Sequence, residues 1–124
     1  MLERVPEDIF HLVAARSEVA KSFNDIWLGA HADTGAGDGY TDPRSSDAVS
    51  WTAYGALMTS AFFQSDLDRL ERRLMEHVDY DGVYKWRDVD NWVRHEKKGQ
   101  KDVVLLFDKA LSRAWQVWAE DRGL

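Results

Sequence analysis

The sequence contains no cysteine among its 124 residues. Disulfide bonds, thiolate zinc sites and cysteine nucleophiles are therefore excluded. No apolar stretch approaches the roughly 18 residues that a membrane-spanning helix needs. The N-terminal stretch carries acids where a signal peptide has bases. Together these absences predict a cytoplasmic protein with no membrane partner.

The sequence also contains fewer basic than acidic residues. Lys and Arg number 16 against 22 Asp and Glu, which gives a formal net charge of −6. Such a balance repels the phosphates of nucleic acids on average. The sequence contains no internal repeat and no low-complexity tract. Its length fits a single domain, residues 1–124, with room for a real core.

Apolar residues at helical spacing are what the chain has in abundance. Hydrophobic residues make up 44% of it and six are Trp, a composition that favours a packed core over disorder. We expect helices over residues 6–28, 46–62, 66–77, 88–95 and 101–121. The predicted fold is all-α, a compact domain of four to five helices with one long Asp/Gly-rich loop at 29–47.

Two apolar stripes support the terminal helices. In the first helix the stripe comprises Ile9, Val13, Ala20, Phe23 and Trp27, with Leu12, Val19 and Ile26 beside it. In the last helix it comprises Val104, Phe107, Leu111, Trp115 and Trp118. We expect these two helices to pack together. Gly55 lies inside a predicted helix, where we expect another helix to approach closely.

Carboxylates are the only candidates for a metal site. Asp33, Asp38 and Asp42 of the long loop could hold a hard cation or form a solvated loop. The stretch 77–88 has the spacing of an EF-hand loop, but it begins with His77 and lacks the final Glu. We interpret that stretch as containing an ordinary Asp-Gly turn. We therefore predict neither a metal nor a cofactor.

The order of landmarks resembles a family of small proteins of unknown function from actinobacteria and their phages, over roughly residues 20–115. The matching positions are Trp27, Gly29, Asp42-Pro43, Ala48, Ser50-Trp51, Gly55-Ala56-Leu57, Trp86, Asp88, Asn91, Gly99-Gln100-Lys101 and the apolar run 103–110. The chain departs from the family pattern at 51–54 and at Arg87-Asp88. The resemblance implies a small soluble accessory protein and no particular reaction.

Bases and tryptophans alternate near the start of the last helix. The candidate interaction surface comprises Lys85, Arg87, Trp92, Arg94, Lys97, Lys98 and Lys101, together with Trp118 near the C-terminus. Bases with aromatics are typical of single-strand nucleic acid binding. Alternatively, the tryptophans of 85–101 point inward and the charges form a solvated rim. The same bases could also meet an acidic protein, and Trp118 could contact a partner or a second copy of the chain.

Catalytic patterns are weak. The four histidines lie in different predicted elements, without the helical spacing of a zinc site. No nucleophile elbow or triad pattern is present. We therefore predict a small non-catalytic binding or regulatory protein that acts on another protein. Nucleic acid binding through residues 85–101 is the alternative, and a metal-dependent enzyme that uses the loop carboxylates is the third.

Overall fold

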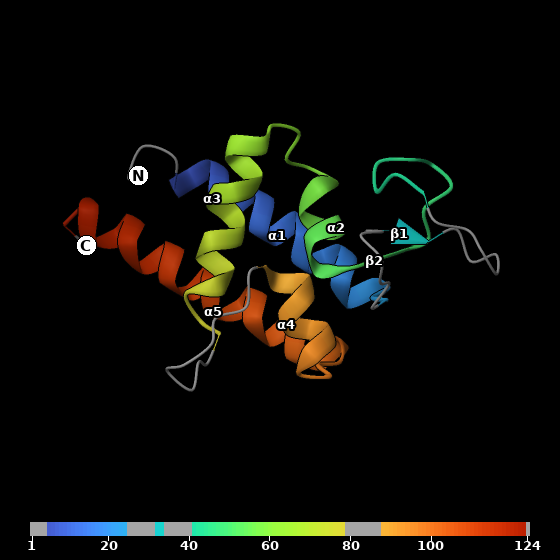
Figure 1. The fold of residues 1–124 in the computed structure, drawn as a ribbon. Coiled ribbons are helices and arrows are strands. Elements are labelled where there is room, and N and C mark those ends of the chain that lie inside the picture. The colour runs from blue at the N-terminus through green and yellow to red at the C-terminus, as the bar shows by residue number, and fades with distance from the viewer. Residues whose placement is uncertain (1–4, 25–31, 34–40, 79–87, 124) are drawn as a thin grey trace.

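The computed structural model describes residues 5–24, 32–33, 41–78 and 88–123. Within these ranges the helices are α1 Val5–Lys21, α2 Ala53–Met58, α3 Gln64–Met75, α4 Val89–His95 and α5 Gln100–Asp121, and the strands are β1 Ala32–Asp33 and β2 Ser50–Trp51. The prediction of an all-α fold is confirmed (Figure 1). No helix in the described part of the chain is long and apolar enough to span a membrane.

The two terminal helices form the base of the fold. The contact between α1 and α5 is the most extensive between any two described elements, as the sequence predicted. Helices α2 and α3 pack against this pair, and α4 packs against α2 and α3 (Figure 1). The main core draws side chains from all five helices. Its largest fully buried side chains include Phe107, Leu12, Leu57, Leu70 and Leu74.

Helix α1 ends at Lys21, earlier than the predicted position 28. The chain then runs beside β2. The amide of Trp51 donates to the Ser22 carbonyl at 3.1 Å, and the amide of Asn24 donates to the Trp51 carbonyl at 3.0 Å. The Ser22 carbonyl and the Asn24 amide, which would continue the helix, therefore form hydrogen bonds with β2 instead. Ile26 and Trp27, expected on the apolar stripe, lie outside the described residues.

The buried face of α1 also differs from the predicted one. Val13 was expected inside but is half-exposed. The buried residues are Val5, Asp8, Ile9, Leu12, Ala15 and Val19. The Leu12 row, predicted to lie beside the stripe, is thus the row that faces the core. An acid, Asp8, lies on that same buried face.

Helix α2 begins later than predicted, at Ala53 instead of residue 46 or 47. Residues Ser50–Trp51 pair antiparallel with Ala32–Asp33 in a strand ladder that the sequence did not predict. Thr52 then caps the helix, and its Oγ1 accepts a hydrogen bond from the Gly55 amide at 3.0 Å. The helix ends at Met58, and Gly55 is buried within it.

Helices α3, α4 and α5 lie close to their predicted ranges. The buried residues of α3 are Leu67, Leu70 and Leu74. Asp88 caps α4 by accepting from the Asn91 amide at 2.8 Å. Phe63 is the N-cap residue of α3, and Asp68 accepts a hydrogen bond from Gln64 at 2.8 Å.

The apolar stripe of α5 is narrower than predicted. Trp115 was expected to face inward but is half-exposed. The buried residues at this end are the small side chains Ala110 and Ala114. Small residues on that face suit the close packing of α5 against α1. Trp118 is partly buried, and its ring meets the Trp115 ring edge to face at 5.8 Å between centroids.

Candidate functional site

The predicted interaction surface is only partly described, because Lys85 and Arg87 lie outside the described residues. Trp92 is 8% exposed and belongs to the main core. Its burial agrees with the interpretation that tryptophans of this segment point inward. The surface available near α4 is therefore formed by charged side chains rather than by an exposed aromatic ring.

A tight turn positions the lysines that follow α4. Lys97 has a positive φ of 54°. The Lys97 amide donates to the Arg94 carbonyl at 3.4 Å and the Lys98 amide to the Val93 carbonyl at 2.9 Å. These are the two bonds of a Schellman motif, with Lys97 where Gly is usual. The turn brings the Lys98 ammonium to 5.5 Å from the centroid of the Trp92 ring. Lys98 therefore covers this ring.

Trp118 does not share this surface. It is separated from Lys101 by most of α5, about 25 Å at the helical rise per residue. The Arg122 guanidinium lies over the Trp118 ring, 4.5 Å from its centroid. The described residues of the predicted surface thus fall on two surfaces, one at each end of α5.

A hollow of about 170 Å³ adjoins the Lys98 turn. It is lined by His77, Trp92, Glu96, Lys98, Asp102, Leu105, Leu106 and Lys109. The Nε2 atom of His77 is buried and has no hydrogen-bond partner among the described residues. Two acids and two lysines balance the charge of the lining, so the hollow favours neither an anion nor a cation.

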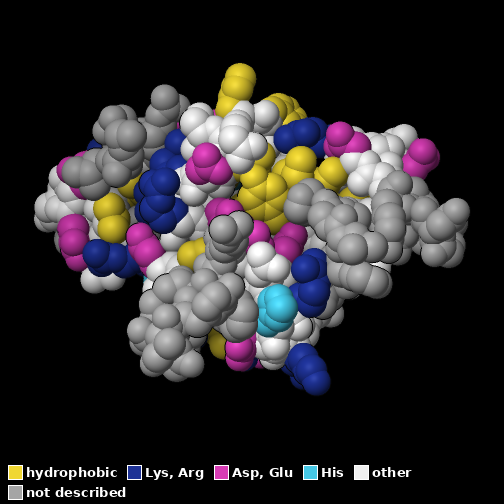
Figure 2. Space-filling view, in the orientation of Figure 1, with side chains coloured by type: hydrophobic (Ala, Val, Ile, Leu, Met, Phe, Trp, Pro, Cys, Tyr) yellow, Lys and Arg dark blue, Asp and Glu magenta, His cyan; other side chains and the backbone are white. Residues whose placement is uncertain are grey.

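Two adjacent aromatic side chains are exposed between α2 and α3. Phe62 is 64% exposed and Phe63 is 70% exposed. The Arg44 guanidinium lies 5.0 Å from the centroid of the Phe62 ring and donates to the Ala61 carbonyl at 3.1 Å. We call Arg44, Phe62 and Phe63 the aromatic apex. Figure 2 shows hydrophobic side chains projecting from the surface over the connection between α2 and α3.

The segment that carries Arg44 is itself anchored. The Trp51 indole Nε1 donates to the Pro43 carbonyl at 2.9 Å. The Arg44 amide donates to a carboxylate oxygen of Asp42 at 2.8 Å. Asp42, one of the three predicted loop carboxylates, therefore closes a local turn. These bonds hold the Arg44 backbone in place, so the Arg44 part of the aromatic apex is preorganised.

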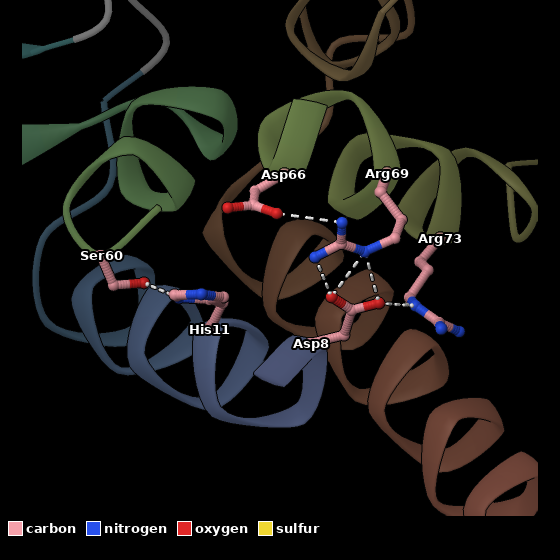
Figure 3. Close-up of polar contacts among 6 residues, drawn as sticks. All are labelled: Asp8, His11, Ser60, Asp66, Arg69 and Arg73. Carbon is pink, nitrogen blue, oxygen red and sulfur yellow. Dashed lines mark hydrogen bonds and ion pairs between the residues drawn. The ribbon is translucent and has the colours of Figure 1, made fainter. Parts of the chain in front are cut away.

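A serine and a histidine also meet near this connection. His11 Nδ1 lies 2.8 Å from Ser60 Oγ (Figure 3). Ser60 follows the C-terminal end of α2, and the amides of Thr59, Ser60 and Ala61 all donate to α2 carbonyls. These three amides are therefore not free to stabilise an oxyanion. The pair joins α1 to the end of α2.

A buried ion-pair network joins α1 to α3 (Figure 3). Asp8 is fully buried, and its carboxylate accepts from Arg69 Nε at 2.8 and 3.0 Å and from Arg73 Nε at 2.6 Å. Arg69 also donates to Asp66 at 3.0 Å. Both carboxylate oxygens of Asp8 are thus bonded to guanidinium groups. The network is a structural link and offers no free acid for chemistry.

Carboxylates also link α2, α3 and α4. The buried Asp90 of α4 accepts from the Thr52 hydroxyl at 2.8 Å and from the Tyr54 amide at 3.1 Å. Glu71 of α3 accepts from the Val89 amide at 3.0 Å. Each acid therefore binds the N-terminus of a neighbouring helix, where backbone amides lack partners.

No group of three or more metal-ligating side chains occurs among the residues that the structure describes. Asp38, the Asp33 side chain and the Asp-Gly turn at 79–82 lie outside the described residues. The metal-dependent alternative and the EF-hand spacing therefore stay untested at these positions.

Comparison with known proteins adds no family to this description. No family model, curated protein or solved structure matches the chain. The resemblance to the actinobacterial and phage family therefore stays a prediction from the sequence.

Proposed function

We propose that this chain is a small non-catalytic binding protein that contacts another protein through the aromatic apex. The observation that carries the proposal is the exposure of two adjacent phenylalanines at 64% and 70%. Aromatic side chains and Arg are enriched at protein interfaces and at their energetic hot spots. The apex combines both residue types within one anchored connection.

The cost of binding also favours this surface. Ordering mobile side chains on association costs free energy, so a surface that is already held in place binds with less loss. Arg44 is fixed by the Ala61 carbonyl and lies over the Phe62 ring. The family resemblance and the cysteine-free composition support an accessory role for a bacterial or phage protein in the cytoplasm of the bacterial cell.

Replacing both apex phenylalanines, Phe62→Ser with Phe63→Ser, is expected to abolish capture of the partner. The loss follows because both rings would be removed from the interface while the core remains intact. Stability should change little, within about 0.5 kcal/mol per site, since substitutions at exposed positions are usually tolerated. Affinity capture from cells of the source organism with quantitative mass spectrometry measures the first effect, and urea unfolding measures the second.

Leu105→Ser provides the matched control. Leu105 is another exposed large apolar side chain, but it lies on α5. This variant should retain every partner that the unmodified protein captures. Sedimentation of the purified protein tests whether the partner is a second copy of the chain. Retention of the captured partners by the double phenylalanine variant would contradict the proposal.

The nucleic acid alternative makes a different prediction. We expect no useful affinity for single-stranded DNA or RNA near physiological salt, because the net charge is −6 and Trp92 is buried. If binding occurs, it should weaken steeply as salt rises, since each neutralised phosphate releases counterions. Fluorescence anisotropy with labelled oligonucleotides measures this. Sub-micromolar binding that Lys97→Glu with Lys98→Glu removes would favour the alternative instead.

A further inference from the structure

The terminal helices α1 and α5 expose a second group of large apolar side chains. Phe10 and Val13 of α1 are 65% and 50% exposed, and Trp115 of α5 is 51% exposed. The Phe10 and Trp115 rings therefore each leave roughly 100 Å² of largely apolar surface in contact with water. Apolar surface that is contiguous marks an interaction site, whereas scattered single residues do not.

The two helices run antiparallel, with the start of α1 beside the end of α5 (Figure 1). Gln100 at the start of α5 donates to the Val19 carbonyl near the end of α1 at 2.8 Å. At the other end, Val5 of α1 belongs to the same apolar cluster as Ala114 and Trp118 of α5. Residues of the two helices can therefore be matched level by level along the pair.

The ion pair between Arg16 and Asp108 sets that match. Arg16 Nε donates to Asp108 Oδ1, and both side chains are partly exposed, so this contact lies at the surface. Phe10 comes six residues before Arg16, and Trp115 comes seven residues after Asp108. These separations are about 9 and about 10.5 Å along the two helices. Phe10 and Trp115 therefore lie at the same level of the pair.

These residues also share one side of the pair. Trp115 follows Asp108 by about two helical turns, so both project from the same side of α5. Val13 precedes Arg16 by three residues and Phe10 precedes Val13 by three more, so the three are successive neighbours on the surface of α1. We call Phe10, Val13, Trp115 and the Arg16–Asp108 pair the α1–α5 face.

We propose that the α1–α5 face is the contact through which two copies of this chain form a dimer. The face is complementary to itself. A twofold axis along the line between the two helices lays α1 of each copy over α5 of the other and keeps every residue at its level. Arg16 of one copy then meets Asp108 of the other, and Phe10 of one copy meets Trp115 of the other. Both contacts are favourable, the first between opposite charges and the second between aromatic rings.

The charge of the α1–α5 face favours a second copy over other partners. At its centre one cation and one anion neutralise each other, whereas a nucleic acid requires clustered cations. The chain as a whole has a net charge of −6. Two copies therefore approach one another best through a surface that is neutral.

The size of the face suits a weak dimer. Helix α1 has 17 residues and is about 25 Å long, and two packed helices are about 20 Å wide. The face thus measures roughly 500 Å² per copy, less than the roughly 800 Å² per partner of a standard interface. We therefore expect a dimer that dissociates in the micromolar range.

Sedimentation equilibrium tests the proposal. The unmodified protein should pass from monomer to dimer between about 1 and 300 μM. Val13→Lys with Trp115→Lys should raise the dissociation constant at least about 30-fold, because ammonium groups of both copies would replace the apolar contact. Val49→Lys is the matched control, since Val49 is as exposed as Val13 but lies beside β2. It should leave the dissociation constant unchanged, and circular dichroism should show the same helix content in all three proteins.

Two charge-reversed variants test the arrangement of the copies. Arg16→Asp makes the centre of the face negative and Asp108→Arg makes it positive, so each variant alone should dimerise more weakly than the unmodified protein. An equimolar mixture should recover dimers, because a negative face then meets a positive one. The apex variant Phe62→Ser with Phe63→Ser should dimerise as the unmodified protein does. A monomer at every concentration, an unchanged dissociation constant for the double lysine variant, or a monomeric apex variant would overturn the proposal.

Discussion

Phe107→Ala is expected to destabilise the protein by about 3–5 kcal/mol. The Phe107 ring is fully buried and belongs to the main core formed by all five helices. Its removal loses the transfer free energy of the ring and leaves a cavity that the surrounding helices fill only in part. Because a domain of this size is stable by about 5–15 kcal/mol in total, the variant should still fold, with a much lower urea midpoint.

A control on the same helix separates burial from helix propensity. Leu105→Ala changes a half-exposed side chain two residues away. It should alter the free energy of unfolding by no more than about 0.5 kcal/mol. If the two alanine variants unfold at the same urea concentration, the assignment of Phe107 to the core is wrong.

Local signals were enough to predict α3, α4 and α5. The leucines of α3 repeat at helical spacing, and Asp88 is an N-cap that depends only on the next three residues. The errors lie where distant segments decide the structure. Helix α1 stops early because residues 22–24 bond to β2, and α2 starts late because β2 itself precedes it and pairs with β1. No local pattern marks that pairing, since each strand has only two residues.

The site was harder to predict than the fold. The burial of Asp8 depends on Arg69 and Arg73, which lie 61 and 65 residues away in the sequence. The aromatic apex was missed because α2 was expected to continue through Phe62. The raised pKa of Glu71 depends first on burial by the packed helices and then on nearby acids, including Asp88 and Asp90 from a distant part of the sequence.

Asp8→Asn is expected to cost about 3 kcal/mol of stability, at the lower end of the range for a broken buried ion pair. The substitution removes the negative charge and leaves Arg69 and Arg73 facing a neutral amide. Their side chains are 16% and 15% exposed, against 0% for Asp8, so water can compensate them only in part. Urea unfolding of the variant and the unmodified protein measures the loss.

The surface pair between Arg16 and Asp108 provides the matched comparison. It also joins two helices, α1 and α5, but its side chains are 39% and 45% exposed. Asp108→Asn should therefore cost at most about 1 kcal/mol. Equal losses in the two Asn variants would show that burial does not govern the Asp8 network. A double-mutant cycle that combines Asp8→Asn with Arg69→Gln then measures the coupling free energy between the two side chains. This coupling should exceed that of the surface pair, because the Asp8 carboxylate has no access to water.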